Sequence, residues 1–283
     1  MIAFVAASPS IDRLHVVDTL TPGGIHRPQR VVAVAGGKAL NAARAAHALG
    51  ADVHAIALLG GHTGRWVAAA LEEEGVTCDA VAGPGETRIC LSVSDGEALT
   101  EFYEPGPELG AEHWDALEAM TARVAARATW VAVAGSLPPG APADGPVRLL
   151  RAARRAGARV ALDVSGEALR LGLEAGPDFV KVNAGEAAEL GFGTAEELRE
   201  AAGHGAAAAV THGADGMELA APDGATHRAE PPRLGAYPVG SGDSALGGFL
   251  AALDAGADWP AALARAAEAG AANAQVPGAG RLG

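Results

Sequence analysis

A glycine-rich turn followed by an acidic residue is the part of this sequence best suited to chemistry. Gly240 and Gly242 flank Ser241, and Asp243 follows directly. Glycines in such a turn permit left-handed backbone conformations that aim successive N–H groups at one point, and a helix starting there adds partial positive charge. We therefore expect an anion hole at this turn, beside the carboxylate of Asp243. The alternative for Asp243 is the ordinary role of a helix-capping carboxylate.

The residues after Asp243 predict the helix that must position this carboxylate. Apolar side chains recur there at a spacing of three or four residues, at Leu246, Phe249, Leu250 and Leu253. Such a stripe predicts a helix over 243–255 that buries one face against the core. The glycine-rich turn would then form the entry to this helix.

Two other phosphate-binding motifs compete with this interpretation. The Gly-x-Gly-x-x-Ala spacing that starts at Gly240 matches the dinucleotide-binding fingerprint, but that motif requires a strand directly before it, and Pro238 occupies the approach. A P-loop requires Ser or Thr after its lysine, whereas Ala39 follows Lys38. The sequence therefore disfavours both motifs.

A second pair of glycines, Gly36 and Gly37, also precedes a predicted helix. Lys38 and Asn41 are spaced by three residues and therefore share one polar face of that helix. Because glycines let the backbone approach a ligand closely, we favour ligand contact for both side chains. Further along the same face we favour a solvated stripe, formed by Arg44 and His47.

Composition limits the class of protein. The chain has 283 residues, of which 49% are hydrophobic and 19% charged, and we predict a single folded domain over 1–283. Its net charge of −13 disfavours nucleic-acid and membrane-surface binding. The first residues lack the positive region of a signal peptide, so we expect a cytoplasmic protein. Cys78 and Cys90 are expected to be reduced, buried thiols.

Short apolar runs alternate with Ala-rich helical segments along the chain. We predict strands at 2–7, 30–34, 53–59, 88–93, 130–134, 159–163, 179–182, 208–211 and 217–220. We predict helices at 38–49, 64–74, 112–127, 145–156, 195–202, 243–255 and 260–274. This order predicts a three-layer α/β/α sandwich with a mostly parallel central sheet. Two segments without helices, 12–34 and 87–104, are predicted to pair as a small β-sheet lid.

The two glycine-rich segments resemble the two signatures of the ribokinase-like PfkB carbohydrate kinases. Further segments are similar to the branch that holds 1-phosphofructokinase and tagatose-6-phosphate kinase, at 8–12, 87–88, 104–107, 135–140, 163–169, 181–186 and 211–216. They follow in the same order and cover almost the whole chain.

The resemblance implies roles on the sugar side. Asp243 would be the general base, and the backbone of Gly240, Ser241 and Gly242 would bind the transferring phosphoryl group. Arg88 would hold the phosphate already on the substrate, since its fork matches phosphate geometry. The remaining substrate-binding residues that it implies are Asp12, Gly36, Gly37, Lys38, Asn41 and Ser136.

The resemblance also implies a nucleotide side. Asn183 and Glu186 resemble the Asn-x-x-Glu motif that positions Mg²⁺ through water, and they would also serve as a helix cap. ATP would lie against Thr211, Gly213 and Gly216, with Asn273 beside the adenine. His212 is interpreted as a surface residue.

These observations predict an ATP-dependent, Mg²⁺-requiring kinase of a ketohexose monophosphate, with fructose 1-phosphate converted to fructose 1,6-bisphosphate as the first choice. Tagatose 6-phosphate, fructose 6-phosphate, a free sugar and a nucleoside are alternative acceptors. A silent sugar-binding regulatory protein is the alternative that is not an enzyme. The resemblance also implies a homodimer formed through the lid.

Overall fold

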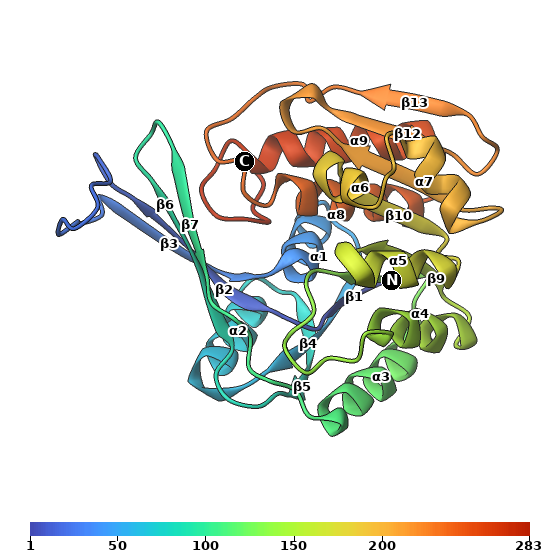
Figure 1. The fold of residues 1–283 in the computed structure, drawn as a ribbon, viewed down its shortest axis with the longest axis horizontal. Helices are drawn as coiled ribbons and strands as arrows, with labels where there is room; N and C mark the ends of the chain where they lie inside the picture. The colour runs from blue at the N-terminus through green and yellow to red at the C-terminus, as the bar shows by residue number, and fades with distance from the viewer.

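Continuous apolar strands form the parallel part of a nine-stranded sheet in the computed structural model, which describes all of residues 1–283 (Figure 1). In spatial order the strands are β13 (Thr226–Ala229), β12 (Met217–Ala220), β11 (Ala207–Thr211), β10 (Phe179–Asn183), β9 (Arg159–Asp163), β8 (Trp130–Ala134), β1 (Ile2–Ala6), β4 (Val53–Leu59) and β5 (Thr77–Ala82). Within this sheet only β12 runs antiparallel to its neighbours, β11 on one side and β13 on the other. The predicted mostly parallel sheet is therefore confirmed.

Helices cover both faces of this sheet, as buried parallel strands require. One face packs against α1 (Lys38–Ala48), α2 (Gly61–Glu73), α8 (Ser241–Asp254) and α9 (Trp259–Asn273). The other packs against α3 (Ala111–Ala125), α4 (Gly145–Arg155), α5 (Gly166–Glu174), α6 (Ala184–Glu189) and α7 (Ala195–Ala202). Each face has its own cluster of buried apolar side chains, which confirms the three layers.

A second, four-stranded sheet extends away from the main body (Figure 1). Its order is β3 (Arg30–Gly36), β2 (Ser10–Val16), β6 (Arg88–Ser94) and β7 (Leu99–Tyr103). These strands come from the two chain segments that the sequence sets apart. Register places Asp12 of β2 opposite Cys90 of β6, on the same face of the sheet. The two cysteines are free, Cys90 buried and Cys78 partly buried.

The strand order reverses at β1, and this reversal locates the site. β1 pairs with β4 on one side and with β8 on the other. Ser8 follows the carboxyl end of β1, and Ser136 follows that of β8. In open α/β sheets ligands bind at this kind of crevice, outside the carboxyl ends of the strands.

None of the helices is both long and apolar enough to cross a bilayer.

Candidate active site

The glycine-rich turn adopts the left-handed conformation that its sequence favours. Gly240 has φ 83° and is the N-cap of α8, which begins at Ser241, two residues before the predicted start. A Cβ at Gly240 would lie 2.6 Å from the Cβ of Ala279, so both conformation and space require glycine. Asp243 lies in the first helical turn and is not the capping residue. The helix start directs its free N–H groups and positive dipole end at this point.

Asn41 joins the two carboxylates that were predicted to handle the sugar. Its Nδ2 donates to Oδ2 of Asp243 at 3.0 Å and to Oδ2 of Asp12 at 3.2 Å. Asp12 also accepts from the backbone N–H of Gly37 at 3.2 Å and from Ser10 Oγ at 2.6 Å. A Cβ at Gly36 would lie 2.1 Å from Cγ of Asp12, so glycine is required for this approach. The structure therefore brings the sugar-side residues of both glycine-rich segments together.

The pKa of the Asp243 carboxyl group is raised above its ordinary value. Its burial raises the pKa to about 6, with the nearby Lys181 ammonium acting in the opposite direction. The negative charge of Asp163 also raises this pKa, and the hydrogen bond from Asn41 lowers it. A carboxylate with a pKa near the working pH is suited to general base catalysis.

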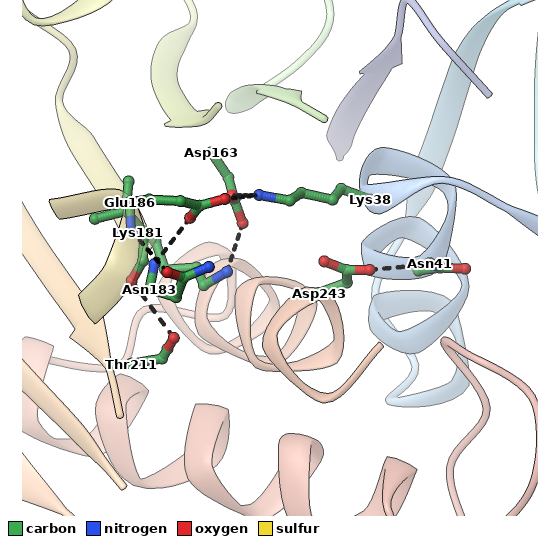
Figure 2. A network of polar contacts seen from close by, with 9 residues as sticks. Lys38, Asn41, Asp163, Lys181, Asn183, Glu186, Thr211 and Asp243 are labelled. Atoms are coloured by element: carbon green, nitrogen blue, oxygen red, sulfur yellow. Dashed lines mark hydrogen bonds and ion pairs between the residues drawn. The ribbon is translucent and has the colours of Figure 1, made fainter. Parts of the chain in front are cut away.

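A chain of alternating charges crosses the floor of the site (Figure 2). Asp163, at the end of β9, is fully buried and accepts from Lys181 Nζ at 2.6 Å and from Lys38 Nζ at 3.0 Å. Lys38 also donates to Oε1 of Glu186 at 2.7 Å. The ammonium of Lys38 is thus turned toward the nucleotide-side motif, although we expected it to contact the sugar. The ion pairs link α1 to the end of β9 and to α6, and β9 to β10.

The buried charges of Asp163 and Lys38 are stabilised by their ion pairs. Burial alone would raise the pKa of Asp163, but the two lysines outweigh it and hold that pKa below its usual value. Burial likewise opposes the charge on Lys38, yet Asp163 and Glu186 raise its pKa overall. Both groups are therefore ionised at neutral pH.

Lys181 is a site residue to which the sequence analysis gave no role. It lies on the buried strand β10, and its side chain is 4% exposed. A Cβ at Gly242 would be 3.3 Å from Lys181 Nζ, so the ammonium lies directly beneath the anion-hole turn. A lysine within an apolar strand requires a buried partner, and that rule is the signal that could have identified it.

Asn183 and Glu186 form the capping box that the sequence predicts at the start of α6. Asn183 Oδ1 accepts from the Glu186 backbone N–H at 2.8 Å, and Glu186 Oε2 accepts from the Asn183 backbone N–H at 2.9 Å. No cluster of three or more metal-ligating side chains exists in the chain. The Glu186 side chain is 15% exposed, and its two oxygens accept from Lys38 Nζ and from the Asn183 backbone N–H. One carboxylate and one amide suit Mg²⁺ that keeps its waters and binds phosphate oxygens, so these residues fit an outer-shell site.

A cavity of ≈ 330 Å³ lies beside the anion-hole turn. Its lining includes Thr211, Gly213, Gly216, Ser241 and Gly242, together with small residues of α9. The cavity thus gathers three of the residues predicted on the nucleotide side, Thr211, Gly213 and Gly216, next to the start of α8, whereas Asn183 and Glu186 do not line it.

The side chain of Asn273, which was predicted to lie beside the adenine, does not line this cavity. Its side chain is fully buried. Oδ1 accepts from Ser244 Oγ and from the Gly280 backbone N–H, and Nδ2 donates to Val239 O at 2.9 Å. With these partners the side chain supports the turn from behind, while neighbouring residues of α9 line the cavity.

Arg88 lies over the point where the strand order reverses. Its Nη2 donates to the backbone oxygen of Ser8 at 3.2 Å and to Ser136 Oγ at 3.3 Å. Its Nε is buried without a partner. The guanidinium therefore lies at the crevice between β1 and β8 with one buried donor unsatisfied, while its Nη1 donates to the backbone oxygen of Glu104 at 3.5 Å.

Comparison with known proteins agrees with this geometry. Residues 2–282 match the family described as pfkB family carbohydrate kinase. The chain is 35% identical over 268 residues to 1-phosphofructokinase of Rhodobacter capsulatus, which covers 91% of this chain and 85% of that protein. Phosphofructokinase-2 from Escherichia coli in complex with fructose-6-phosphate has a TM-score of 0.87 at 27% identity, covering 96% and 92% of the two chains. The tetrameric inhibited form of that enzyme has a TM-score of 0.86 at 27% identity, covering 96% and 93%.

Proposed function

The chain belongs to the pfkB family of carbohydrate kinases, and from that premise we propose that it transfers the terminal phosphoryl group of ATP to the 6-hydroxyl of fructose 1-phosphate. Membership makes it an ATP-dependent sugar kinase that works with Mg²⁺. The choice of fructose 1-phosphate is supported by the 35% identity to a 1-phosphofructokinase. A specific rival is fructose 6-phosphate, which is bound in a similar solved structure.

The hydrogen bonds from Asn41 to both Asp12 and Asp243 carry this proposal. Asp12 binds sugar hydroxyls, and Asn41 keeps the acceptor hydroxyl within reach of Asp243. Asp243 takes the proton of that hydroxyl while the hydroxyl oxygen attacks the terminal phosphorus of ATP. The leaving group is ADP. Since phosphoryl transfer depends on positioning and charge stabilisation, little further covalent chemistry is required of the protein.

Negative charge on the transferring phosphoryl group is stabilised from the side opposite the sugar. The backbone N–H groups of Gly240 and Gly242 would face the phosphoryl position at the positive end of α8, whereas the Ser241 N–H donates to the backbone oxygen of Pro238 at 3.1 Å. Lys181 adds a buried positive charge directly beneath Gly242. Asn183 and Glu186 would hold Mg²⁺ through water, and the ion would supply neutralisation of phosphate charge.

The position of Arg88 supports the proposal that the substrate already carries a phosphate. Its guanidinium is held at the crevice by Ser8 and Ser136 and leaves Nε unpaired. A planar guanidinium with free donors is the group best matched to a phosphate.

A coupled assay of ADP release tests the substrate directly. The panel contains fructose 1-phosphate, fructose 6-phosphate, tagatose 6-phosphate, free fructose and a nucleoside, each with MgATP. The highest kcat/KM is expected for fructose 1-phosphate. A higher value for another acceptor would replace that substrate, and no turnover with any acceptor would favour a silent sugar-binding protein.

We propose that the four-stranded sheet closes over the sugar as a lid and that its outer face pairs with a second copy of the chain. Register places Val31 and Phe102 on the face opposite Asp12. These two side chains are 57% and 58% exposed. Sedimentation should give a dimer, and Phe102→Glu should give a monomer. A wild-type monomer at micromolar concentration would exclude this interface.

A further inference from the structure

Arg44 is buried on α1, where its guanidinium joins three separate parts of the chain. The side chain is 1% exposed, so the expected solvated stripe is wrong at this position. Nε and Nη2 donate to the two carboxylate oxygens of Glu74 at 2.6 and 2.8 Å. Nη1 donates to the backbone oxygens of Ala35, at 3.3 Å, and Ala279, at 2.6 Å. The fixed fork of an arginine can serve all these acceptors at once.

The segment 277–280, which we name the wedge loop, lies between α1 and the anion-hole turn. On one side, a Cβ at Gly280 would be 2.7 Å from the backbone oxygen of Asn41. On the other side, Ala279 packs so closely on Gly240 that a Cβ there would approach to 2.6 Å. The wedge loop therefore sets the separation between Asn41 and the turn. Contacts between backbones leave no flexible side chain to absorb a displacement.

Asn273 connects the wedge loop to the turn by hydrogen bonds as well. Its Oδ1 accepts from the backbone N–H of Gly280 at 2.8 Å. Its Nδ2 donates to the backbone oxygen of Val239 at 2.9 Å and to Ser241 Oγ at 3.3 Å. The loop and the turn consequently form one unit, and Arg44 fastens this unit to α1 through Ala279.

We propose that Arg44 is a positioning residue for phosphoryl transfer. It acts through the wedge loop, which holds the N–H groups of the turn in register with Asp243 and Asn41. This inference rests on the proposed function, because it takes the turn to be the phosphoryl-binding element. Arg44 itself touches no reacting atom. Displacement of preorganised groups by a fraction of an ångström affects the transition state more than ground-state binding.

The test compares Arg44→Lys and Arg44→Met with Arg151→Met, an exposed arginine on α4. Arg44→Met should lower kcat on the order of ten- to hundredfold with the KM values for sugar phosphate and ATP within about threefold. Arg44→Lys should restore part of kcat, since a lysine keeps the charge but cannot form the fork. Arg151→Met should match the wild type.

Hydrogen exchange gives a readout that is independent of turnover. Amides of 237–245 and 277–281 should exchange faster in Arg44→Met, while those of α3 stay protected. Ala279→Gly removes only the methyl group beneath Gly240 and should lower kcat without a buried-charge defect. This variant decides the question if Arg44→Met does not fold.

The inference is overturned if kcat of the folded variants, including Ala279→Gly, equals that of the wild type, or if exchange at 237–245 is unchanged. Inactive wild-type protein would instead contradict the proposed function, and the exchange experiment would still test the link from Arg44 to the turn.

Discussion

Gly247 of α8 lies directly against the backbone oxygen of Ala42 on α1. A Cβ at Gly247 would be 2.3 Å from that oxygen and 3.0 Å from the nitrogen of Ala46. The two helices therefore touch backbone to backbone one turn beyond the hydrogen bond between Asn41 and Asp243. This contact fixes how closely the base approaches the amide that orients it.

Gly247→Ala should push α8 away from α1. We expect a loss of about 1–3 kcal/mol in the free energy of unfolding, as is typical of overpacked cores. Turnover should fall as well, because Asp243 moves away from Asn41. Denaturant unfolding and the coupled assay measure both effects, with Gly193→Ala as the control at a site with ordinary space. Equal activity in the two variants would contradict a role for this contact in catalysis.

Activity should depend on the ionisation of Asp243, whose pKa is raised to about 6 by burial. A general base must be deprotonated, so kcat/KM should fall about tenfold per pH unit below that pKa. Asp243→Asn should lower kcat on the order of 10²- to 10⁴-fold and remove this acidic limb while sugar-phosphate binding remains measurable. A residual activity close to wild type would exclude Asp243 as the base.

The same raised pKa predicts that Asp243 costs stability at neutral pH. A carboxyl group whose pKa rises on folding, here from 3.8 to about 6, favours the folded state at low pH and loses that contribution as pH rises through 6. Asp243→Asn should therefore raise the thermal midpoint relative to wild type at pH 8, and the difference should shrink toward pH 4. Thermal unfolding at the two pH values checks this; a difference that grows on acidification would reverse the assigned sign.

Arg88→Ala should separate phosphorylated from free sugars. Loss of charge-assisted hydrogen bonds worth about 1.5–3 kcal/mol should raise the KM for the sugar phosphate by one to two orders of magnitude. The KM for free fructose, where turnover can be measured, should not change. Arg170→Ala on α5 is the matched control. An equal effect on both sugars would count against a phosphate contact by Arg88.

Lys181→Met should be strongly destabilising because it leaves Asp163 buried with one partner fewer. Removal of one member of a buried ion pair costs about 3–5 kcal/mol, reduced here by the remaining bond from Lys38. The double variant Lys181→Met/Asp163→Asn should recover part of the stability but not the turnover. Recovery of turnover would mean that Lys181 contributes only to folding.

Much of the fold could be predicted because its buried strands are short and largely apolar, as in β1 and β8. Outside the lid, the strands and α-helices that were not predicted are β5, β13, α5 and α6, and none of them is a continuous apolar run. Strand β5 is partly exposed and contains Asp79, β13 is polar at the sheet edge, and α6 has only six residues. Their positions depend on tertiary pairing, which local periodicity does not encode.

The candidate site divides in the same way. Glycines at 36, 37, 240 and 242 are recognisable because their backbone requirement is local. The roles of Lys181, Arg44 and Asn273 depend on partners far away in sequence, such as Asp163 for Lys181 and Ala279 for Arg44. A single sequence shows that such residues are polar or charged, but it does not show which distant group pairs with them when they are buried.

The packing of α1 against α8, and of α8 against α9, has a consequence for biosynthesis. A ribosome releases the first helix long before the last two, so the part of α1 that packs on α8 has no cover while most of the polypeptide is still being translated. Docking of the final helices must then complete both the core and the reaction centre in one late event. Nascent chains halted before residue 241 should accordingly be chaperone clients and prone to aggregate.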